Sequence, residues 1–305
     1  MASHLGREIE DRKTATQRNI AFSLTGEIVY VLTADTRNPS VTAWDVSSEK
    51  LVGRVAIESD SCFEARMKKG VLLSRAAGNL EMWNFELSSC VRRWVNLPGG
   101  VTKIIPISEE RVVLGCVYTV IILNTTSSEI MLIPIFHGQF VTSNSKCRLL
   151  TRSSNSLQLL DGQTTLWETA LCRPTPLAMF SLSERFVVIC AETQEADPGM
   201  YVLDAFLGGI LHILCEVDEF SDCQFVSDEE CVISSRTASG GSSLRLFNVE
   251  SGDLLGVIDL EREVSHLAVC PHKRLLAIDR SDCELGFELI QVHLPQDKDS
   301  RKDKR

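Results

Sequence analysis

The sequence predicts an all-β protein, a single seven-bladed β-propeller of four-stranded blades, closed by pairing of the N-terminal segment with the last blade. Short segments rich in Val, Ile, Leu, Phe and Thr follow one another along most of the 305 residues. They group into units of about 40 residues with four segments each, which is the signature of a propeller blade. Closed all-β folds of this size commonly form one domain.

The clearest unit ends in residues 242–260, SSLRLFNVESGDLLGVIDL, which predicts a strand, a tight turn and a strand. SLRLFNV alternates apolar and polar residues, as a strand with two different faces does. ESGD has the composition of a turn, and Gly252 can adopt a positive φ there. Weaker copies of this pattern recur along the chain.

In each unit the third strand ends on an apolar residue that is followed by Asp, Asn or Gln and then by a turn. These pairs recur at intervals of about 40 residues. They are Trp44-Asp45, Trp83-Asn84, Leu123-Asn124, Leu160-Asp161, Leu203-Asp204, Phe247-Asn248 and Ile290-Gln291. A solenoid of helix pairs can share this period, but the segments here are too short and too rich in β-branched residues.

Taken in order, the units supply the strands of seven blades. The strands of the first blade are predicted at residues 19–23, 28–34, 40–46 and 50–57. Those of the second are at 62–67, 70–74, 79–85 and 90–96. Those of the third are at 101–107, 111–116, 119–124 and 129–135. The strands of the fourth blade are predicted at residues 139–143, 147–151, 156–161 and 164–170. Those of the fifth are at 176–182, 185–191, 200–205 and 209–217. Those of the sixth are at 223–227, 231–235, 243–249 and 253–260. The seventh has only 264–270, 274–279 and 284–292.

The seventh blade lacks an outer strand, and its bare edge would be an aggregation hazard. Residues 3–9, SHLGREI, resemble the outer strands predicted for the first and sixth blades. We therefore expect residues 3–9 to pair with residues 286–292 and close the ring.

This closure predicts three parts of the chain. Residues 1–19 form an N-terminal segment that supplies the closing strand, and residues 20–295 form the propeller. Residues 296–305, QDKDSRKDKR, contain no apolar side chain and are expected to be a disordered charged tail.

The repeats resemble those of the WD-repeat family over roughly residues 19–293. AFSLTGEIVYVLTAD with VTAWDV, and LRLFNVESGDLLGVI, look like the family's repeat consensus. Only Trp44-Asp45 is a literal Trp-Asp pair, and no Gly-His dipeptide opens a blade. The family's buried Asp–His–Ser–Trp hydrogen-bond network is therefore not expected in this chain. The eroded blades are also similar to the C-terminal propellers of NACHT and WD-repeat proteins.

The bulk composition excludes several kinds of partner. A net charge of −10 and a pI near 5.2 argue against general binding to nucleic acid or to anionic membranes. The start of the chain lacks the apolar core of a signal peptide. Eleven cysteines without a C-x-x-C motif fit buried thiols in a reducing cytoplasm.

No motif for catalysis or for a cofactor is found. The sequence has no G-x-S-x-G and no phosphate-binding G-x-x-x-x-G-K-[ST]. His266, Cys270 and His272 share a strand face, but the strand's rise spreads them over about 20 Å, too far for one zinc ion. We expect no metal site, no cofactor and no enzymatic activity.

Arginines recur in the loops that join the second and third strands of the predicted blades. They are Arg37, Arg75, Arg152, Arg236 and Arg280, in five of the seven blades. In a propeller these loops gather on one face, where an arginine-lined rim suits carboxylate or phosphate groups of a partner. The alternative is a face of mixed sign, because the loops around the fifth blade add acidic residues. These include Glu192, Glu195, Asp197, Glu216, Asp218, Glu219 and Asp222.

These observations predict a non-catalytic scaffold or ligand-sensing propeller that binds other proteins, including acidic segments, through its loop faces. We expect it to be cytoplasmic, and to act as a monomer or as a subunit of a larger assembly.

Two alternatives remain. A propeller enzyme would carry its site at the channel mouth, but the inner strands offer no matched acid–base set. Their candidates are Ser23, Lys103, Ser143, Ser181, Ser227 and His266. The other alternative is a structural subunit of a coat or large assembly.

Overall fold

The fold is described here from a computed structural model. It describes residues 3–5, 18–33, 39–48, 50–57, 63–67, 70–75, 78–86, 88–98, 100–116, 119–134, 139–143, 145–152, 155–171, 178–191, 199–216, 220–236, 241–261, 264–270, 273–280 and 287–292. These residues form seven four-stranded antiparallel sheets, which confirms the predicted seven-bladed propeller.

Each sheet is one blade, and its strands follow one another from the inner to the outer edge. Blade one holds β2 (Arg18–Phe22), β3 (Ile28–Thr33), β4 (Ser40–Asp45) and β5 (Leu51–Ala56). Blade two holds β6 (Phe63–Met67), β7 (Gly70–Arg75), β8 (Asn79–Asn84) and β9 (Ser89–Trp94). Blade three holds β10 (Val101–Ser108), β11 (Arg111–Cys116), β12 (Thr119–Asn124) and β13 (Ile130–Pro134). Blade four holds β14 (Gln139–Ser143), β15 (Leu149–Arg152), β16 (Ser156–Asp161) and β17 (Thr164–Ala170).

The remaining blades follow the same order. Blade five holds β18 (Ala178–Phe180), β19 (Phe186–Ala191), β20 (Gly199–Asp204) and β21 (Ile210–Glu216). Blade six holds β22 (Phe220–Phe225), β23 (Glu230–Arg236), β24 (Ser242–Asn248) and β25 (Leu254–Leu260). Blade seven holds β26 (Val264–Cys270), β27 (Leu275–Arg280), β28 (Phe287–Gln291) and, at its outer edge, β1 (Ser3–Leu5).

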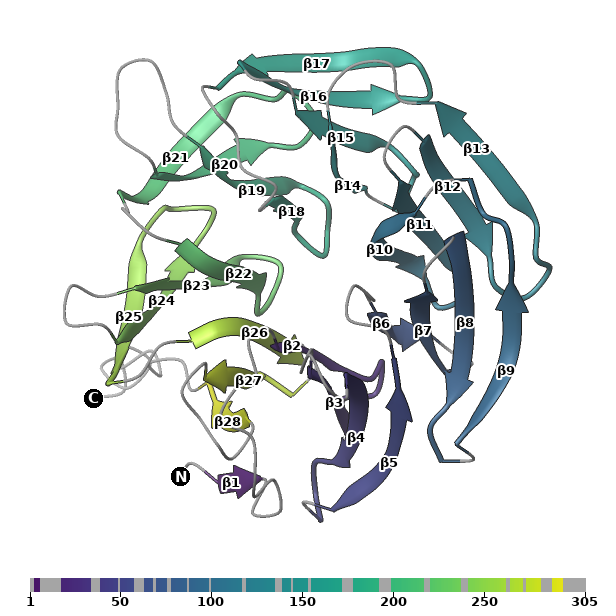
Figure 1. The fold of residues 1–305 in the computed structure, drawn as a ribbon. Coiled ribbons are helices and arrows are strands. Elements are labelled where there is room, and N and C mark those ends of the chain that lie inside the picture. The colour runs from purple at the N-terminus through teal and green to yellow at the C-terminus, as the bar shows by residue number, and fades with distance from the viewer. Residues whose placement is uncertain are drawn as a thin grey trace, which may run out of the picture.

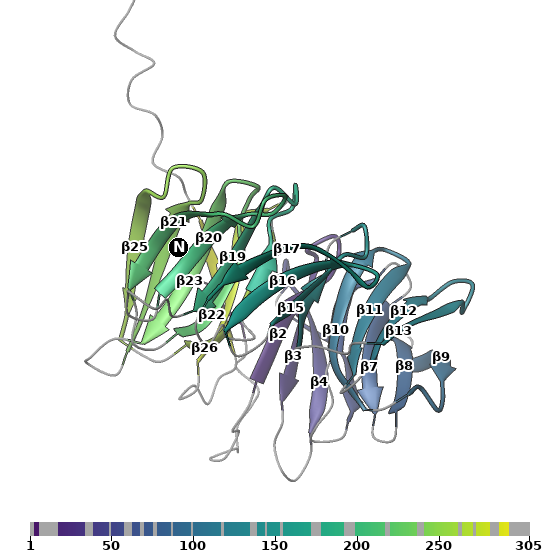
Figure 2. The ribbon, with the colours of Figure 1, turned by 90° about the horizontal axis from the view of Figure 1, so that it is seen from above.

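The blades are arranged around a central axis, with the first strand of each nearest the centre and the last at the periphery (Figure 1). Seen at right angles to this view, the strands run between the two faces of the ring (Figure 2). We call the face where second strands end and inner strands begin the rim face. The opposite face, where third strands turn into outer strands, is called the turn face.

The hydrophobic core lies between neighbouring blades. Buried apolar side chains form seven clusters, and each cluster joins one blade to the next. In β19, for example, Val187 and Ile189 pack with blade four, while Phe186 and Val188 pack with blade six. A strand between two blades is buried on both sides, which explains the continuous apolar runs of the second strands.

In blades one, three, five and six, the Asp or Asn that ends the third strand caps the following turn. The Oδ1 of Asp45 accepts hydrogen bonds from the backbone N–H groups of Ser47 and Ser48, at 3.1 and 2.7 Å. Asn124, Asp204 and Asn248 make the equivalent bonds in blades three, five and six. The recurring residue pair of the sequence therefore marks the same turn in these four blades, because a short side-chain oxygen satisfies the donors of the turn.

The fifth position of these turns lies in the left-handed backbone region. Gly208 and Gly252 adopt φ values of 73° and 79°, which glycine adopts without strain. Ser88 and Ser128 take the same place in blades two and three, with φ values of 47° and 64°.

Outer strands bind the turn of the following blade through different side chains. Arg92 of β9 donates from Nη1 to the carbonyl oxygens of Thr125 and Thr126, both at 2.8 Å. Trp167 of β17 donates to the carbonyl of Ala205 at 3.0 Å. These contacts join neighbouring blades.

The ring closes as the sequence predicts. β1 pairs antiparallel with β28, with Ser3 opposite Leu289 and Leu5 opposite Phe287. Figure 1 shows β1 beside β28 at the outer edge of blade seven. The predicted pairing extended to residue 9, and residues 6–9 lie outside the described residues.

Candidate functional site

Four of the five predicted rim arginines occupy equivalent positions in the fold. Arg75, Arg152, Arg236 and Arg280 are each the last residue of the second strand of their blade. They therefore lie at the strand end rather than in the loop, and all four lie on the rim face. Only the backbone is described for Arg236 and Arg280, and Arg37 lies outside the described residues.

Arg75 is engaged within the ring. Its Nε donates to Oε2 of Glu81 at 3.0 Å, and its Nη2 donates to the carbonyl of Ala56, in blade one, at 3.0 Å. Trp83 also donates from Nε1 to Glu81, at 2.9 Å, and Arg93 forms an ion pair with the other carboxylate oxygen at 2.7 Å. Arg75 therefore joins blades one and two.

Glu81 carries a buried charge that these partners stabilise. Only 6% of its side chain is exposed, and burial alone would raise the pKa of Glu81. Hydrogen bonds from Trp83 and Arg75 and the charges of Arg75 and Arg93 outweigh burial and hold the pKa below its usual value. The sequence did not reveal this network, although Glu81 and Trp83 lie on the same side of β8.

A second positive group lies near Arg152. Lys103 in the inner strand β10 donates from Nζ to the carbonyl of Val141, in the inner strand of blade four. Burial, together with the charge of Arg152, lowers the pKa of Lys103 to about 8. At neutral pH the rim face at blades three and four therefore carries two cations close enough to repel each other.

The structure brings Asp222 and His266 together on neighbouring inner strands, β22 and β26. His266 Nδ1 and Asp222 Oδ2 are 4.0 Å apart, beyond hydrogen-bond range. The carboxylate oxygens instead accept from two backbone N–H groups. Oδ1 accepts from Cys223 at 2.8 Å and Oδ2 from Leu267 at 3.0 Å. Asp222 thereby links blade six to blade seven.

Burial dominates the ionisation of both groups. It raises the pKa of Asp222 to about 6, despite the hydrogen bonds that favour the charged form, and it lowers the pKa of His266. Asp222, predicted to lie in a loop, lies in β22, which begins at Phe220. The sequence contained a signal for this strand. The polar residues Asp222 and Gln224 alternate with the apolar residues Cys223 and Phe225, which are buried.

Three serines considered for the channel mouth are turn caps. Ser23 Oγ accepts from the backbone N–H of Ile28 at 3.1 Å, and Ser181 Oγ accepts from Phe186 at 3.1 Å. Ser227 Oγ donates to Glu230 Oε2 at 3.1 Å. Their shared role is to order the turn between the first two strands of a blade.

Three further features concern metal ligands, thiols and membrane spans within the described ranges. No group of three His, Cys, Asp or Glu side chains there is arranged to hold a metal ion. Cys116, Cys190, Cys223, Cys231 and Cys270 are buried as expected, whereas Cys90 is exposed on β9. Among the described residues, no helix is long and apolar enough to cross a membrane.

The turn face carries a feature that the sequence analysis missed. Phe206 and Leu207, at the tip of the turn in blade five, are 60% and 78% exposed. Leu182, in the neighbouring turn of the same blade, is 58% exposed. The signal was present in the sequence, because Phe-Leu stands where the turns of blades one and three have Ser-Ser and Thr-Ser.

No protein-family model and no curated protein matches the sequence. Solved structures with the same fold were found. The WD40 domain of Neurospora crassa Pan2 superposes with a TM-score of 0.71 at 12% identity, covering 97% of both chains. The β-propeller domain of Cps50 (Swd1) from Myceliophteria thermophila gives a TM-score of 0.68 at 12% identity, covering 93% of this chain and 98% of that one.

A chain of the mitotic checkpoint complex is also similar, with a TM-score of 0.65 at 12% identity over 96% of this chain and 95% of that chain. At this identity the likeness establishes the fold and nothing finer. The chain is thus a seven-bladed β-propeller with the architecture of WD40 domains.

Proposed function

We propose that this propeller is a protein-interaction scaffold that binds acidic segments of partner proteins at its rim face. The observation that carries the proposal is the equivalent placement of Arg152, Arg236 and Arg280, each at the end of the second strand of its blade. Lys103 adds a cation beside Arg152. Guanidinium groups bind carboxylates in bidentate geometry, and a rigid ring holds them at fixed separations.

Arg75 belongs to the same set and also holds the ring together, because its guanidinium binds Glu81 and the carbonyl of Ala56. Arg37 completes the proposed set from blade one. Proteins that contain WD40 propellers supply the general precedent, since one of the similar structures is a chain of a mitotic checkpoint complex.

Charge reversal tests this function. We expect Arg236→Glu with Arg280→Glu to remove partners from an affinity pull-down. The proposal requires both guanidinium groups to face solvent, and the melting temperature should then stay unchanged, because surface substitutions usually alter stability by less than about 0.5 kcal/mol. The matched control reverses Lys50 and Arg54, which are exposed on or beside the outer strand of blade one. Identical sets of captured proteins for the rim variant, the control and the wild type would refute a role for the rim.

We further propose that the propeller is a cytoplasmic sensor module of the NACHT and WD-repeat type. The degenerate repeats, with one literal Trp-Asp pair, support this assignment. Sequencing the full transcript tests it: an upstream nucleotide-binding domain in the same reading frame is expected, and a transcript without one contradicts the assignment.

A further inference from the structure

We propose that the turn face at blades five and six binds a protein segment that combines apolar side chains with Lys or Arg. The inference rests on the proposed function as an interaction module and assigns it a second surface, opposite the rim face. The surface has two parts. The apolar tip comprises Leu182, Phe206 and Leu207, and beside it lie the acidic turns of blade six.

The composition of the apolar tip is not required by the fold. The capping residue binds the two backbone N–H groups of the tip in blades one, three, five and six alike. The side chains at these two positions are Ser-Ser, Thr-Ser, Phe-Leu and Glu-Ser in chain order. Polar residues therefore form the same turn, and the large apolar pair of blade five stays mostly in water. Aromatic and aliphatic side chains exposed in this way mark interaction sites.

The tip is held rigidly by its own cap. Asp204 Oδ1 accepts hydrogen bonds from the backbone N–H groups of Phe206 and Leu207, at 2.7 and 2.8 Å. The N–H of Gly208 closes the turn on the carbonyl of Asp204 at 2.8 Å. Because the backbone of the tip is already ordered, a partner that covers these two side chains has no loop to order, which favours binding.

The outer strand of blade four, β17, also contacts this turn. Trp167 donates to the carbonyl of Ala205 at 3.0 Å, and Thr169 donates to the carbonyl of Gly208 at 2.5 Å. A Cβ at Gly208 would lie 2.6 Å from the Trp167 ring, so the turn and the ring are in close contact. The tip is therefore presented by two blades together.

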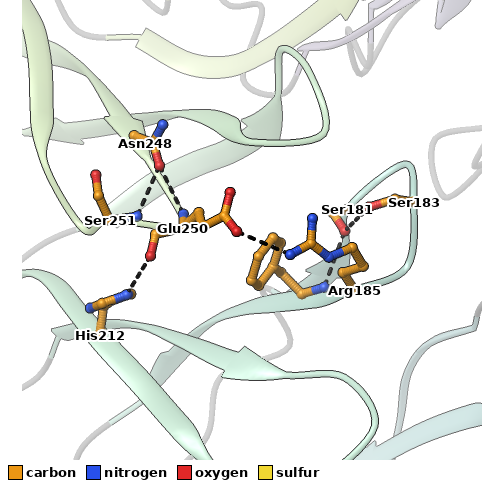
Figure 3. A network of polar contacts seen from close by, with 8 residues as sticks. Ser181, Ser183, Arg185, His212, Asn248, Glu250 and Ser251 are labelled. Carbon is orange, nitrogen blue, oxygen red and sulfur yellow. Dashed lines mark hydrogen bonds and ion pairs between the residues drawn. The ribbon is translucent and has the colours of Figure 1, made fainter.

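A polar network connects blade five to the turn of blade six (Figure 3). The backbone N–H of Ala205 donates to the carbonyl of Arg185 at 2.9 Å, which joins the two turns of blade five. Arg185 forms an ion pair with Glu250 at 3.1 Å, and His212 Nε2 lies 2.8 Å from the carbonyl of Glu250. The apolar tip and the turns of blade six are thus parts of one connected surface.

The charge of this surface selects the partner. The turns of blades five and six, residues 181–186, 204–209, 226–230 and 248–253, contain seven carboxylates and one guanidinium. The carboxylates belong to Glu184, Asp204, Asp228, Glu229, Glu230, Glu250 and Asp253. Two of these carboxylates are already paired: Glu250 with Arg185 at 3.1 Å, and the buried Glu230 with Arg274 of blade seven at 3.4 Å. The other five leave the surface acidic. An acidic surface around an apolar tip attracts a segment with basic groups flanking apolar ones and repels anionic lipid.

Other occupants fit this surface less well. The chain's own residues 296–305 are rich in Lys and Arg but contain no apolar side chain to cover the tip. A second copy that docked through its own turn face would bring the same acidic surface. A basic and apolar segment of another protein satisfies both parts of the surface.

Peptide selection followed by binding measurements tests the proposal. Phage-displayed random 12-residue peptides are selected on the intact protein and counter-selected on the variant Phe206→Ser with Leu207→Ser. We expect the retained peptides to be enriched in Leu or aromatic residues next to Lys or Arg. In fluorescence anisotropy the best peptide should bind the double variant at least tenfold more weakly. Asp228→Lys with Glu229→Lys should weaken binding in a salt-dependent way.

Matched variants keep the test specific. Met131→Ser with Leu132→Ser removes two similarly exposed apolar side chains from the outer strand of blade three and should leave peptide affinity unchanged. Glu109→Lys with Glu129→Lys reverses two exposed charges in the turns of blade three and should also have no effect. The proposal is overturned if no selected peptide binds wild type more tightly than the tip variant, or if all selected peptides are acidic. Acidic peptides whose binding requires Arg236 and Arg280 would support the rim function while refuting this one.

Discussion

Asp222 of blade six accepts a hydrogen bond from the backbone N–H of Leu267 in blade seven, with 3.0 Å between Oδ2 and the nitrogen. The bond joins the inner strands of two blades next to the closure of the ring. The carboxylate is buried, and its pKa is raised from 3.8 to about 6. The strength of this contact between blades therefore depends on pH.

The first prediction concerns this pH dependence. A carboxyl whose pKa is higher in the folded than in the unfolded state stabilises the fold at low pH, and the stabilisation is lost as pH rises through the folded pKa. From pH 4 to pH 7 we expect wild type to lose about 2–3 kcal/mol of unfolding free energy relative to Asp222→Asn, since one pKa unit corresponds to about 1.4 kcal/mol. Urea unfolding of both proteins at each pH measures the difference.

His266 provides the control for this prediction. Its pKa is lowered by burial, so it destabilises the fold as pH falls, which is the opposite direction. When His266→Gln is present in both proteins, the difference in unfolding free energy between Asp222 and Asp222→Asn should therefore still change with pH. A difference that does not vary with pH would show that Asp222 does not titrate in this range.

The second prediction separates two tryptophans at equivalent strand ends. Trp44 is 6% exposed between blades one and seven and lies edge-on to Phe287 with ring centroids 6.4 Å apart. Trp44→Ala should cost about 3–5 kcal/mol, as for other buried aromatic residues. Trp83 is only partly buried, so Trp83→Ala should cost at least about 1 kcal/mol less. Thermal and denaturant unfolding measure both, and equal costs would contradict the observed difference in burial.

The third prediction tests the ion network of blade two. Glu81→Ala leaves Arg75, whose side chain is 18% exposed, without its carboxylate partner. Removing one partner of a buried ion pair costs about 3–5 kcal/mol, and denaturant unfolding should show a loss of this size. Arg93 is 58% exposed, so Arg93→Ala should cost at most about 1 kcal/mol. A Glu81→Ala protein as stable as Arg93→Ala would show that the network does not stabilise the ring.

The fourth prediction concerns ring closure. Deleting residues 1–12 removes β1 and uncovers the edge of β28, which contains Phe287 and Leu289. We expect a lower melting temperature and oligomerisation through the bare edge, measured by calorimetry and light scattering. Deleting residues 296–305 is the control and should change neither property. A monomer of unchanged stability after the first deletion would mean that β1 does not contribute to closure.

The sequence by itself determined the architecture, because the signals for it are local. Alternation of side chains, turn composition and the regular return of an apolar residue before Asp or Asn act over a few residues, and they marked seven blades and their strands. Even the closing strand at residues 3–5 was found, because it resembles the outer strands of other blades.

Only the tertiary structure decided what the side chains between blades do. Arg75 reaches the carbonyl of Ala56 in the preceding blade, and Asp222 binds Leu267 in the next one. The exposure of Phe206 and Leu207 likewise follows from a turn that Trp167 of blade four holds in place. These contacts join residues that are 19 to 45 positions apart in the chain. Patterns within one blade carry no information on such pairs, since partners are chosen by the packing of neighbouring blades.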